Sequence, residues 1–286
     1  MKKNILTLTL LTITASLSLS LSATASDDAV SDEIIAAQRA ALETNTDGKG
    51  FGPQSPRDID LVAGENLIAF DTAPLPEEMN LCNIHFHENA EHKGGEFTEY
   101  AGNGDGHGYN SGYKYTGTLT EAELSATTED ICPSSHGYLK PGATIEVHYV
   151  HSTAQVDPGP TLGACLSDSI SNPQLRVETQ VYVLVNDENA LDFANLTAHD
   201  KATGKNQVLN IPSDTGNSIQ YSGSTTGPGY NEDGSPLQVS WSVRPQVAKV
   251  NIESVGDWCK GNVYEEDHAH GVRNLVQNQK LLSTIK

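Results

Sequence analysis

Two histidines stand two positions apart in the segment CNIHFHENAEHKGGEF (82–97). The residues NIHFH are rich in β-branched and aromatic types, which predicts a strand. Side chains two apart in a strand project from the same face, so His85 and His87 present two imidazoles side by side. Ile84 and Phe86 then turn to the opposite, core face. Such a pair can bind a transition metal, although surface histidines give the same pattern.

A second histidine-bearing strand is predicted by ATIEVHYVHS (143–152). On one face of this strand lie Glu146, His148 and Val150. If it neighbours the first strand, His148 adds a third nitrogen. Three histidines with an open fourth position are typical of a catalytic zinc, because a structural site is closed by a fourth protein ligand. We therefore predict one Zn²⁺ per chain, held by His85, His87 and His148.

Two polar residues are placed to orient these ligands. A ligating imidazole usually donates its second N–H to a carboxylate or a carbonyl. Glu146 shares the face of His148, and Asn83 shares the face of His85, so we expect both to accept such hydrogen bonds. The other histidines have no comparable pairing and are predicted to be structural or solvated: His92, His107, His136, His151, His199, His268 and His270.

Predicted strands follow one another along the chain without alternating helices, which disfavours a βαβ architecture. Further strands are predicted in NLIAF (66–70), LRVETQVYVLV (175–185), LQVSWSVRP (237–245) and AKVNIES (248–254). Loops rich in Gly, Asn, Asp and Pro separate them. Before the strands, SDEIIAAQRAALE (31–43) predicts a helix with Ser31 as its N-cap. We expect one mainly β domain with long loops and an N-terminal helical arm.

The N-terminus has the layout of a secretory signal peptide. Lys2 and Lys3 precede a short apolar run interrupted by Ser and Thr, and Ala23-Thr24-Ala25 forms a small-residue cleavage site. The run is too short and too polar for a membrane anchor. We predict a signal peptide at 1–25, the helical arm at 26–50 and a zinc domain at 51–286. The mature chain would be periplasmic or secreted, with no membrane insertion after processing.

The net charge limits the kinds of binding partner, and the cysteines indicate the cellular compartment. The formal net charge of −20 becomes −22 once Lys2 and Lys3 are removed, and such a surface repels nucleic acid and anionic membranes. An even number of cysteines in an exported protein predicts disulfides, here among Cys82, Cys132, Cys165 and Cys259. Three pairings can be drawn, and the sequence does not choose among them. It also leaves the oligomeric state open.

Five motifs in a fixed order resemble those of the α-type carbonic anhydrases. They are QSPRDI (54–59), NIHFH, the pair Glu91-His92, EVHYVHS (146–152), and YSGSTTGPG (221–229) followed by VSW (239–241). CNIHFHENAEH and DWCKGNVYEEDHAHGVRNLV (257–276) are more similar to the δ-class carbonic anhydrases of diatoms and marine bacteria. The resemblance covers the chain from Gln54 to about Val276.

The resemblance implies a central, mostly antiparallel twisted sheet with short helices, and zinc at the bottom of a conical cleft. It implies reversible hydration of CO2 to bicarbonate and a proton by attack of zinc-bound hydroxide. Thr226 resembles the threonine that orients this hydroxide, and Glu91 resembles the glutamate that accepts from the threonine. Val150 and Trp241 match the apolar wall that receives CO2.

The sequence departs from the α pattern in several places. Glu91 follows His87 by a shorter turn, so it could instead be a carboxylate beside the metal ligands. An insert at 94–144 contains Cys132, and Gly227 replaces a second threonine. No residue matches the proton-shuttle histidine.

Two other functions fit part of the pattern. His85-x-His87-x3-Glu91 also resembles half of a cupin motif that binds iron or manganese in a β-barrel. That motif does not explain the blocks at 54–59 and 221–229. A non-catalytic exported zinc-binding protein could keep the fold without the chemistry.

Overall fold

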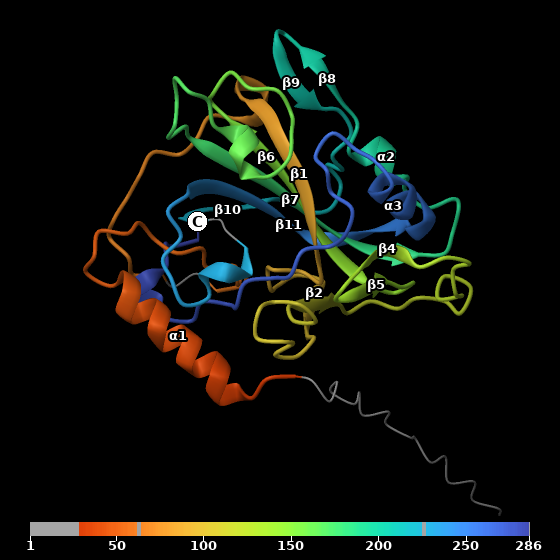
Figure 1. Cartoon of the computed structure of the whole chain (residues 1–286), viewed down its shortest axis with the longest axis horizontal. Coiled ribbons are helices and arrows are strands. Elements are labelled where there is room, and N and C mark those ends of the chain that lie inside the picture. The colour runs from red at the N-terminus through yellow and green to blue at the C-terminus, as the bar shows by residue number, and fades with distance from the viewer. Residues whose placement is uncertain (1–28, 62–63, 225–226, 286) are drawn as a thin grey trace, which may run out of the picture.

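The computed structural model describes residues 29–61, 64–224 and 227–285 (Figure 1). The predicted signal peptide (1–25) and Thr226 lie outside the described residues. The helices are α1 (Asp32–Thr46), α2 (Phe193–Leu196) and α3 (Ile252–Cys259), with 3-10 turns η1 (Pro76–Glu78), η2 (Leu162–Cys165), η3 (Pro228–Tyr230) and η4 (Gln279–Leu281).

Five strands form the central sheet in the order β1-β6-β7-β11-β10. They are β1 (Asn80–Glu88), β6 (Thr144–Ser152), β7 (Leu175–Val185), β10 (Ile219–Ser224) and β11 (Gln238–Asn251). Neighbours are antiparallel except β7 and β11, which are parallel. Figure 1 shows this sheet crossing the middle of the molecule. The prediction of one mainly β domain with a central, mostly antiparallel sheet is confirmed.

Three small hairpins lie outside the central sheet. They pair β2 (Phe97–Tyr100) with β3 (Tyr113–Tyr115), β4 (Ile131–Ser134) with β5 (Gly137–Leu139), and β8 (His199–Ala202) with β9 (Lys205–Val208). The first two hairpins fall in the insert at 94–144 that the sequence predicted as an addition to the α pattern.

Alternation along the strands builds one apolar cluster on each side of the sheet. Ile84 and Phe86 are fully buried in a cluster with Trp258 of α3, as the alternation in NIHFH predicts. Val150 and Trp241 belong to a second cluster. The strands that carry the candidate ligands are therefore fixed by packing on both faces, which holds their side chains in a defined register.

The predicted helix is present and ends three residues later than expected. Ser31 occupies the N-cap position with extended backbone, but its side chain makes no cap hydrogen bond. Leu42 packs in a cluster with Val276, Leu281 and Leu282 of the C-terminal segment. Arg39 Nε donates to the carbonyl of Leu275 at 3.1 Å. The arm is thus packed onto the β domain near its C-terminus.

One strand prediction is wrong, and another is right only for its first four residues. Residues 66–70 form no strand: the Asn66 N–H donates to the Leu282 carbonyl in a single backbone contact, and Leu67 is 95% exposed. At 248–254, Ala248 to Asn251 continue β11, but the chain turns at Ile252 into α3. Asn251 caps α3, because its side chain accepts from the N–H of Glu253.

The structure contains two disulfides and decides the pairing that the sequence left open. Cys82 on β1 pairs with Cys165 at the end of η2, and Cys132 on β4 pairs with Cys259 at the end of α3. The second bond joins the insert at 94–144 to α3. Within the described ranges, no helix has the length and apolar character needed to cross a membrane.

Candidate metal centre

The pairing of β1 with β6 brings the three predicted histidines together. His85 lies opposite His148 in the antiparallel register, and His87 follows on the same face. The ring centres are 5.3 Å apart for His85 and His87, 5.0 Å for His85 and His148, and 4.8 Å for His87 and His148. Their nearest nitrogens all lie within 4.8 Å of one another.

One nitrogen of each histidine is occupied by an oxygen acceptor. His85 Nδ1 donates to Asn83 Oδ1 at 2.6 Å, and His148 Nε2 donates to Glu146 Oε1 at 2.6 Å. His87 Nδ1 donates to the carbonyl of Gly271 at 2.8 Å. The first two contacts join residues that the strand pattern places together. The third comes from a segment to which the sequence assigned no role.

These hydrogen bonds leave one lone pair on each ring for a metal. His85 Nε2 and His148 Nδ1 lie 3.2 Å apart, and tetrahedral zinc with Zn–N bonds near 2.0–2.1 Å needs about 3.3 Å. His87 Nε2 is buried without a hydrogen-bond partner in the described part of the chain. A buried nitrogen without a partner costs free energy that a bound cation would recover. The three nitrogens therefore fit a zinc ion.

Burial keeps two of the three imidazoles neutral. It lowers the pKa of His87 to about 4, with a further contribution from His148. It also lowers the pKa of His85 well below its usual value, again with help from His148. A neutral imidazole is the form that binds a metal, so His85 and His87 can take up the ion near neutral pH without displacing protons.

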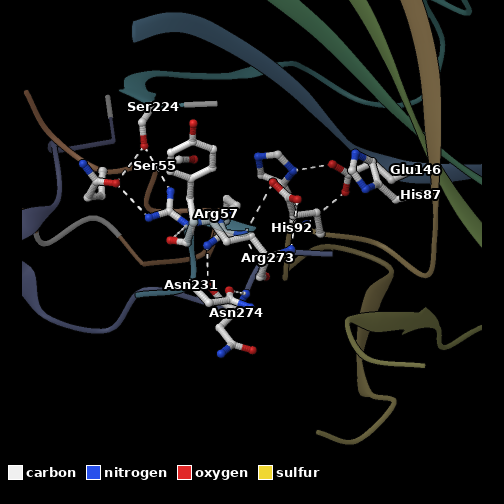
Figure 2. Close-up of polar contacts among 12 residues, drawn as sticks. Ser55, Arg57, His87, His92, Glu146, Ser224, Asn231, Arg273 and Asn274 are labelled. Atoms are coloured by element: carbon white, nitrogen blue, oxygen red, sulfur yellow. Dashed lines mark hydrogen bonds and ion pairs between the residues drawn. The ribbon is translucent and has the colours of Figure 1, made fainter. Parts of the chain in front are cut away.

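Glu146 connects His148 to a buried chain of polar groups. Figure 2 shows Glu146 beside His92, the next member of this chain. Its carboxylate also accepts from His92, from Nδ1 at 2.7 Å and from the backbone N–H at 2.9 Å. The second ring nitrogen of His92 contacts the hydroxyl of Tyr221, which lies 2.7 Å from Ser55 Oγ. Burial raises the pKa of Glu146, but the two histidines outweigh it and hold that pKa well below its usual value.

His92, Glu146 and His148 also bring their ligand atoms within 4.8 Å of one another. The nitrogens of His92 are committed to Glu146 and Tyr221, so this second group is held by its own hydrogen bonds. His92 has the structural role expected for it.

The Glu91 carboxylate is held by two arginine residues. Its Oε1 lies 3.4 Å from Nη1 of Arg57, and its Oε2 accepts from the backbone N–H of Arg273 at 3.2 Å. Burial raises the pKa of Glu91, but Arg57, His87 and His148 together outweigh it and lower that pKa. Within the described residues, Glu91 does not join the group of metal-binding atoms.

Arg273, which the sequence did not single out, joins two of the sequence motifs, those at 54–59 and 221–229. Its Nη2 donates to Gln54 Oε1 at 2.8 Å, its Nη1 to Ser224 Oγ at 3.2 Å, and its Nε to the carbonyl of Tyr230 at 3.0 Å. Ser224 and Tyr230 flank the segment that contains Thr226 in the sequence. Figure 2 shows Arg273 beside Arg57, with Ser224 on one side and Asn274 on the other.

A cavity of about 180 Å³ opens beside the three histidines. Its described lining consists of the three ligand candidates with Asn83, Thr161, Leu162, Gly227, Glu266 and His270. His270, expected to be structural or solvated, thus lies at the cavity, where its Nε2 is 2.6 Å from Glu266 Oε2. Burial lowers the pKa of His270, but the hydrogen bond to Glu266 and the negative charges of Glu266 and Asp267 together outweigh it, and the pKa is raised.

Val150 and Trp241, predicted as the substrate pocket, do not occur in the described lining of this cavity. Val150 is fully buried in the core, and Trp241 packs edge-on against His148 with ring centres 5.1 Å apart. Thr161 and Leu162 were missed because they follow β6 in a loop whose position depends on the Cys82–Cys165 bond.

A comparison with protein-family models assigns the chain to a family. A model of the Delta carbonic anhydrase family matches residues 76–254, which is well over half of the 286 residues and includes all three histidines. The chain belongs to this family. It is therefore an enzyme of the carbonic anhydrase type, with CO2 and bicarbonate as its small-molecule substrates.

Similar solved structures are also carbonic anhydrases. The alpha-carbonic anhydrase of Photobacterium profundum is 18% identical, with 83% of this chain and 90% of that chain covered and a TM-score of 0.28. The alpha-carbonic anhydrase of Thermovibrio ammonificans, in complex with sulfanilamide, is 15% identical over 78% and 84% of the two chains, with a TM-score of 0.26. At these values the likeness adds nothing to the family assignment. No curated protein matches the sequence.

Membership in the carbonic anhydrase family overturns both alternative functions. The cupin motif requires Glu91 beside the histidines, whereas the structure pairs that carboxylate with Arg57. The hypothesis of a non-catalytic zinc-binding protein is wrong, because the family is one of enzymes.

Proposed function

We propose that this carbonic anhydrase is an exported zinc enzyme that hydrates CO2 reversibly at the three-histidine centre, with one zinc per chain. The observation that carries the proposal is the orientation of the three imidazoles. Each has one nitrogen bonded to an oxygen acceptor, and the other nitrogens converge around a buried His87 Nε2 that lacks a partner among the described residues.

Zinc held by these nitrogens would lower the pKa of a water molecule to near neutrality, so that it can attack the carbon of CO2. Residues of the chain would orient the zinc ligands. Glu146 would hold the tautomer of His148 and increase the basicity of its Nδ1. Asn83 would do the same for His85 without adding charge.

Glu91 and Thr226 would orient the attacking water. Arg57 and the N–H of Arg273 hold the Glu91 carboxylate, and its lowered pKa keeps it ionised. An ionised carboxylate can only accept, so it would take the hydroxyl proton of Thr226 and leave the threonine oxygen as an acceptor for the water. This role of Thr226 rests on its motif, since the residue lies outside the described ranges.

Two observations support export to the periplasm or the medium. The first 25 residues have the layout of a cleaved signal peptide. All four cysteines are disulfide-bonded, which is usual in oxidising compartments and rare in the cytosol. N-terminal sequencing of the protein from the periplasm and from the medium should find cleavage after Ala25. Full-length protein in the cytosol would contradict export.

One set of assays tests the activity. The purified mature protein should contain about one zinc per chain. It should hydrate CO2, lose this activity to a chelator, recover it with Zn²⁺, and be inhibited by a primary sulfonamide. Iron or manganese without hydratase activity would contradict the proposal, as would zinc without activity.

A further inference from the structure

The segment at 159–165, which ends in η2, lies at the same cavity as the three histidines and the C-terminal segment that carries Glu266 and His270. Thr161 and Leu162 line the cavity. Thr161 adopts a left-handed backbone with φ 57°, and its side chain accepts from the N–H of Gly163 at the start of the 3-10 turn. Such a conformation in a non-glycine residue persists only when its surroundings hold it.

The segment is fastened to both strands that carry the histidines. The Cys82–Cys165 disulfide joins it to β1, and the N–H of Gly159 donates to the Cys82 carbonyl at 3.0 Å. Ser152 at the end of β6 donates from Oγ to the Cys165 carbonyl at 2.7 Å. These bonds explain how a loop can keep a fixed position beside the ligands.

The same segment sets the orientation of His85. Asn83 Nδ2 donates to the carbonyl of Gly159 at 3.1 Å. A carbonyl oxygen only accepts, so the amide nitrogen must face it, and Oδ1 is left to accept from His85 Nδ1. The backbone at Gly159 therefore determines which nitrogen of His85 remains free for a metal.

Leu162 is the one aliphatic side chain in the described lining of this cavity. The other lining residues are histidines, polar or acidic side chains and Gly227. Leu162 is partly buried and packs on the core cluster that contains Val150. Uncharged CO2 gains from an apolar surface that excludes water, and Leu162 offers one beside the histidines.

We propose that residues 159–165 form the substrate wall of this site, with Leu162 as the contact for CO2, and that the wall also holds His85 through Asn83. The proposal rests on the proposed function, because it assumes CO2 hydration beside these histidines.

Leu162→Trp tests the wall by filling the cavity, and Leu162→Ala by removing the contact. Both should keep zinc. We expect kcat/KM for CO2 to fall about tenfold or more in Leu162→Trp, and less in Leu162→Ala, on the scale of one methylene group in an apolar pocket. Leu67→Ala, at a 95% exposed position, is the matched control and should behave as the wild type.

A second readout separates this proposal from the proposed function. Azide binding to the cobalt(II)-substituted protein, followed by visible absorption, should weaken about tenfold in Leu162→Trp. If kcat/KM and azide affinity both stay within about twofold of the wild type, a change below the tenfold scale of a pocket contact, the wall proposal is wrong. A wild type that binds zinc without hydrating CO2, and whose azide binding still depends on Leu162, would overturn the function and keep the wall.

The disulfide provides the remaining test. Cys82→Ser/Cys165→Ser should weaken azide binding and speed the loss of zinc to a chelator, because both the wall and Asn83 are released. The control is Cys132→Ser/Cys259→Ser, which removes the bond between β4 and α3 and should lower Tm without changing azide affinity. Equal effects of the two pairs on azide affinity would contradict the proposal. If the Cys82→Ser/Cys165→Ser protein does not fold, the Leu162 variants still test the proposal.

Discussion

Glu146 Oε1 accepts the Nε2 hydrogen of His148 at 2.6 Å, so only Nδ1 of that histidine can face a metal ion. The two residues stand two apart on β6, and their side chains share the face that meets His85 and His87. The same carboxylate accepts from His92. One buried charge thus fixes two imidazoles.

Replacing Glu146 with Gln should weaken zinc binding without removing the ligands. Both rings contact Oε1, and the backbone N–H of His92 donates to Oε2. An amide must turn its NH2 group toward either the two rings or that N–H, so the hydrogen bonding that holds His148 is disturbed. Loss of such a partner typically costs about 10–100-fold in metal affinity. Competition with a chromophoric chelator measures the change. Glu178→Gln on neighbouring β7 is the control, and an equal loss there would show that the effect is not specific to His148.

Replacing His148 with Ala should abolish stoichiometric zinc retention, because two imidazoles remain for an ion that takes four ligands. Metal analysis after gel filtration checks this result. His136→Ala provides the comparison, since that exposed ring stacks on Tyr109 away from the centre. A His148→Ala protein that keeps one zinc per chain would require a different ligand set.

Thr226→Ala should keep zinc and lose activity. The zinc ligands are unchanged, but the acceptor that orients the attacking water is removed, a loss of about 100-fold in kcat on the scale of one positioned hydrogen bond in a transition state. Stopped-flow CO2 hydration and metal analysis on the same sample measure both quantities. Thr225→Ala is the neighbouring control. Full activity in Thr226→Ala would remove this residue from the mechanism.

His151 should make the fold sensitive to acid. Burial lowers its pKa from 6.5 to about 4 in the folded protein. Between these values the unfolded chain binds a proton that the folded chain does not, so stability is complete above pH 6.5 and falls as the pH decreases toward 4. The slope from this residue reaches about 1.4 kcal/mol per pH unit.

Urea unfolding of the metal-free protein at several pH values tests this slope. His151→Leu should flatten the pH dependence between 6.5 and 4 relative to the wild type, whatever its effect on stability at pH 7. An unchanged slope in His151→Leu would mean that other groups take up the protons.

The alternation of side chains was sufficient to predict the centre of this site. His85, His87 and His148 needed only the two-residue period of a strand and the pairing of two predicted strands. The same period placed Ile84 and Phe86 in the core and set Asn83 and Glu146 beside their histidines. It failed at 66–70, where apolar residues suggested a strand but no neighbouring strand was present to pair with them.

The sequence by itself thus determined the ligand strands, the family motifs and an even set of cysteines. Only the tertiary structure decided which cysteines pair, that the carbonyl of Gly271 orients His87 from 184 positions away, and that Leu162 rather than Val150 lines the cavity. The physical reason is the distance along the chain over which each property acts. Strand periodicity is a local property of the backbone, whereas contacts between loops depend on how distant segments close over the finished sheet.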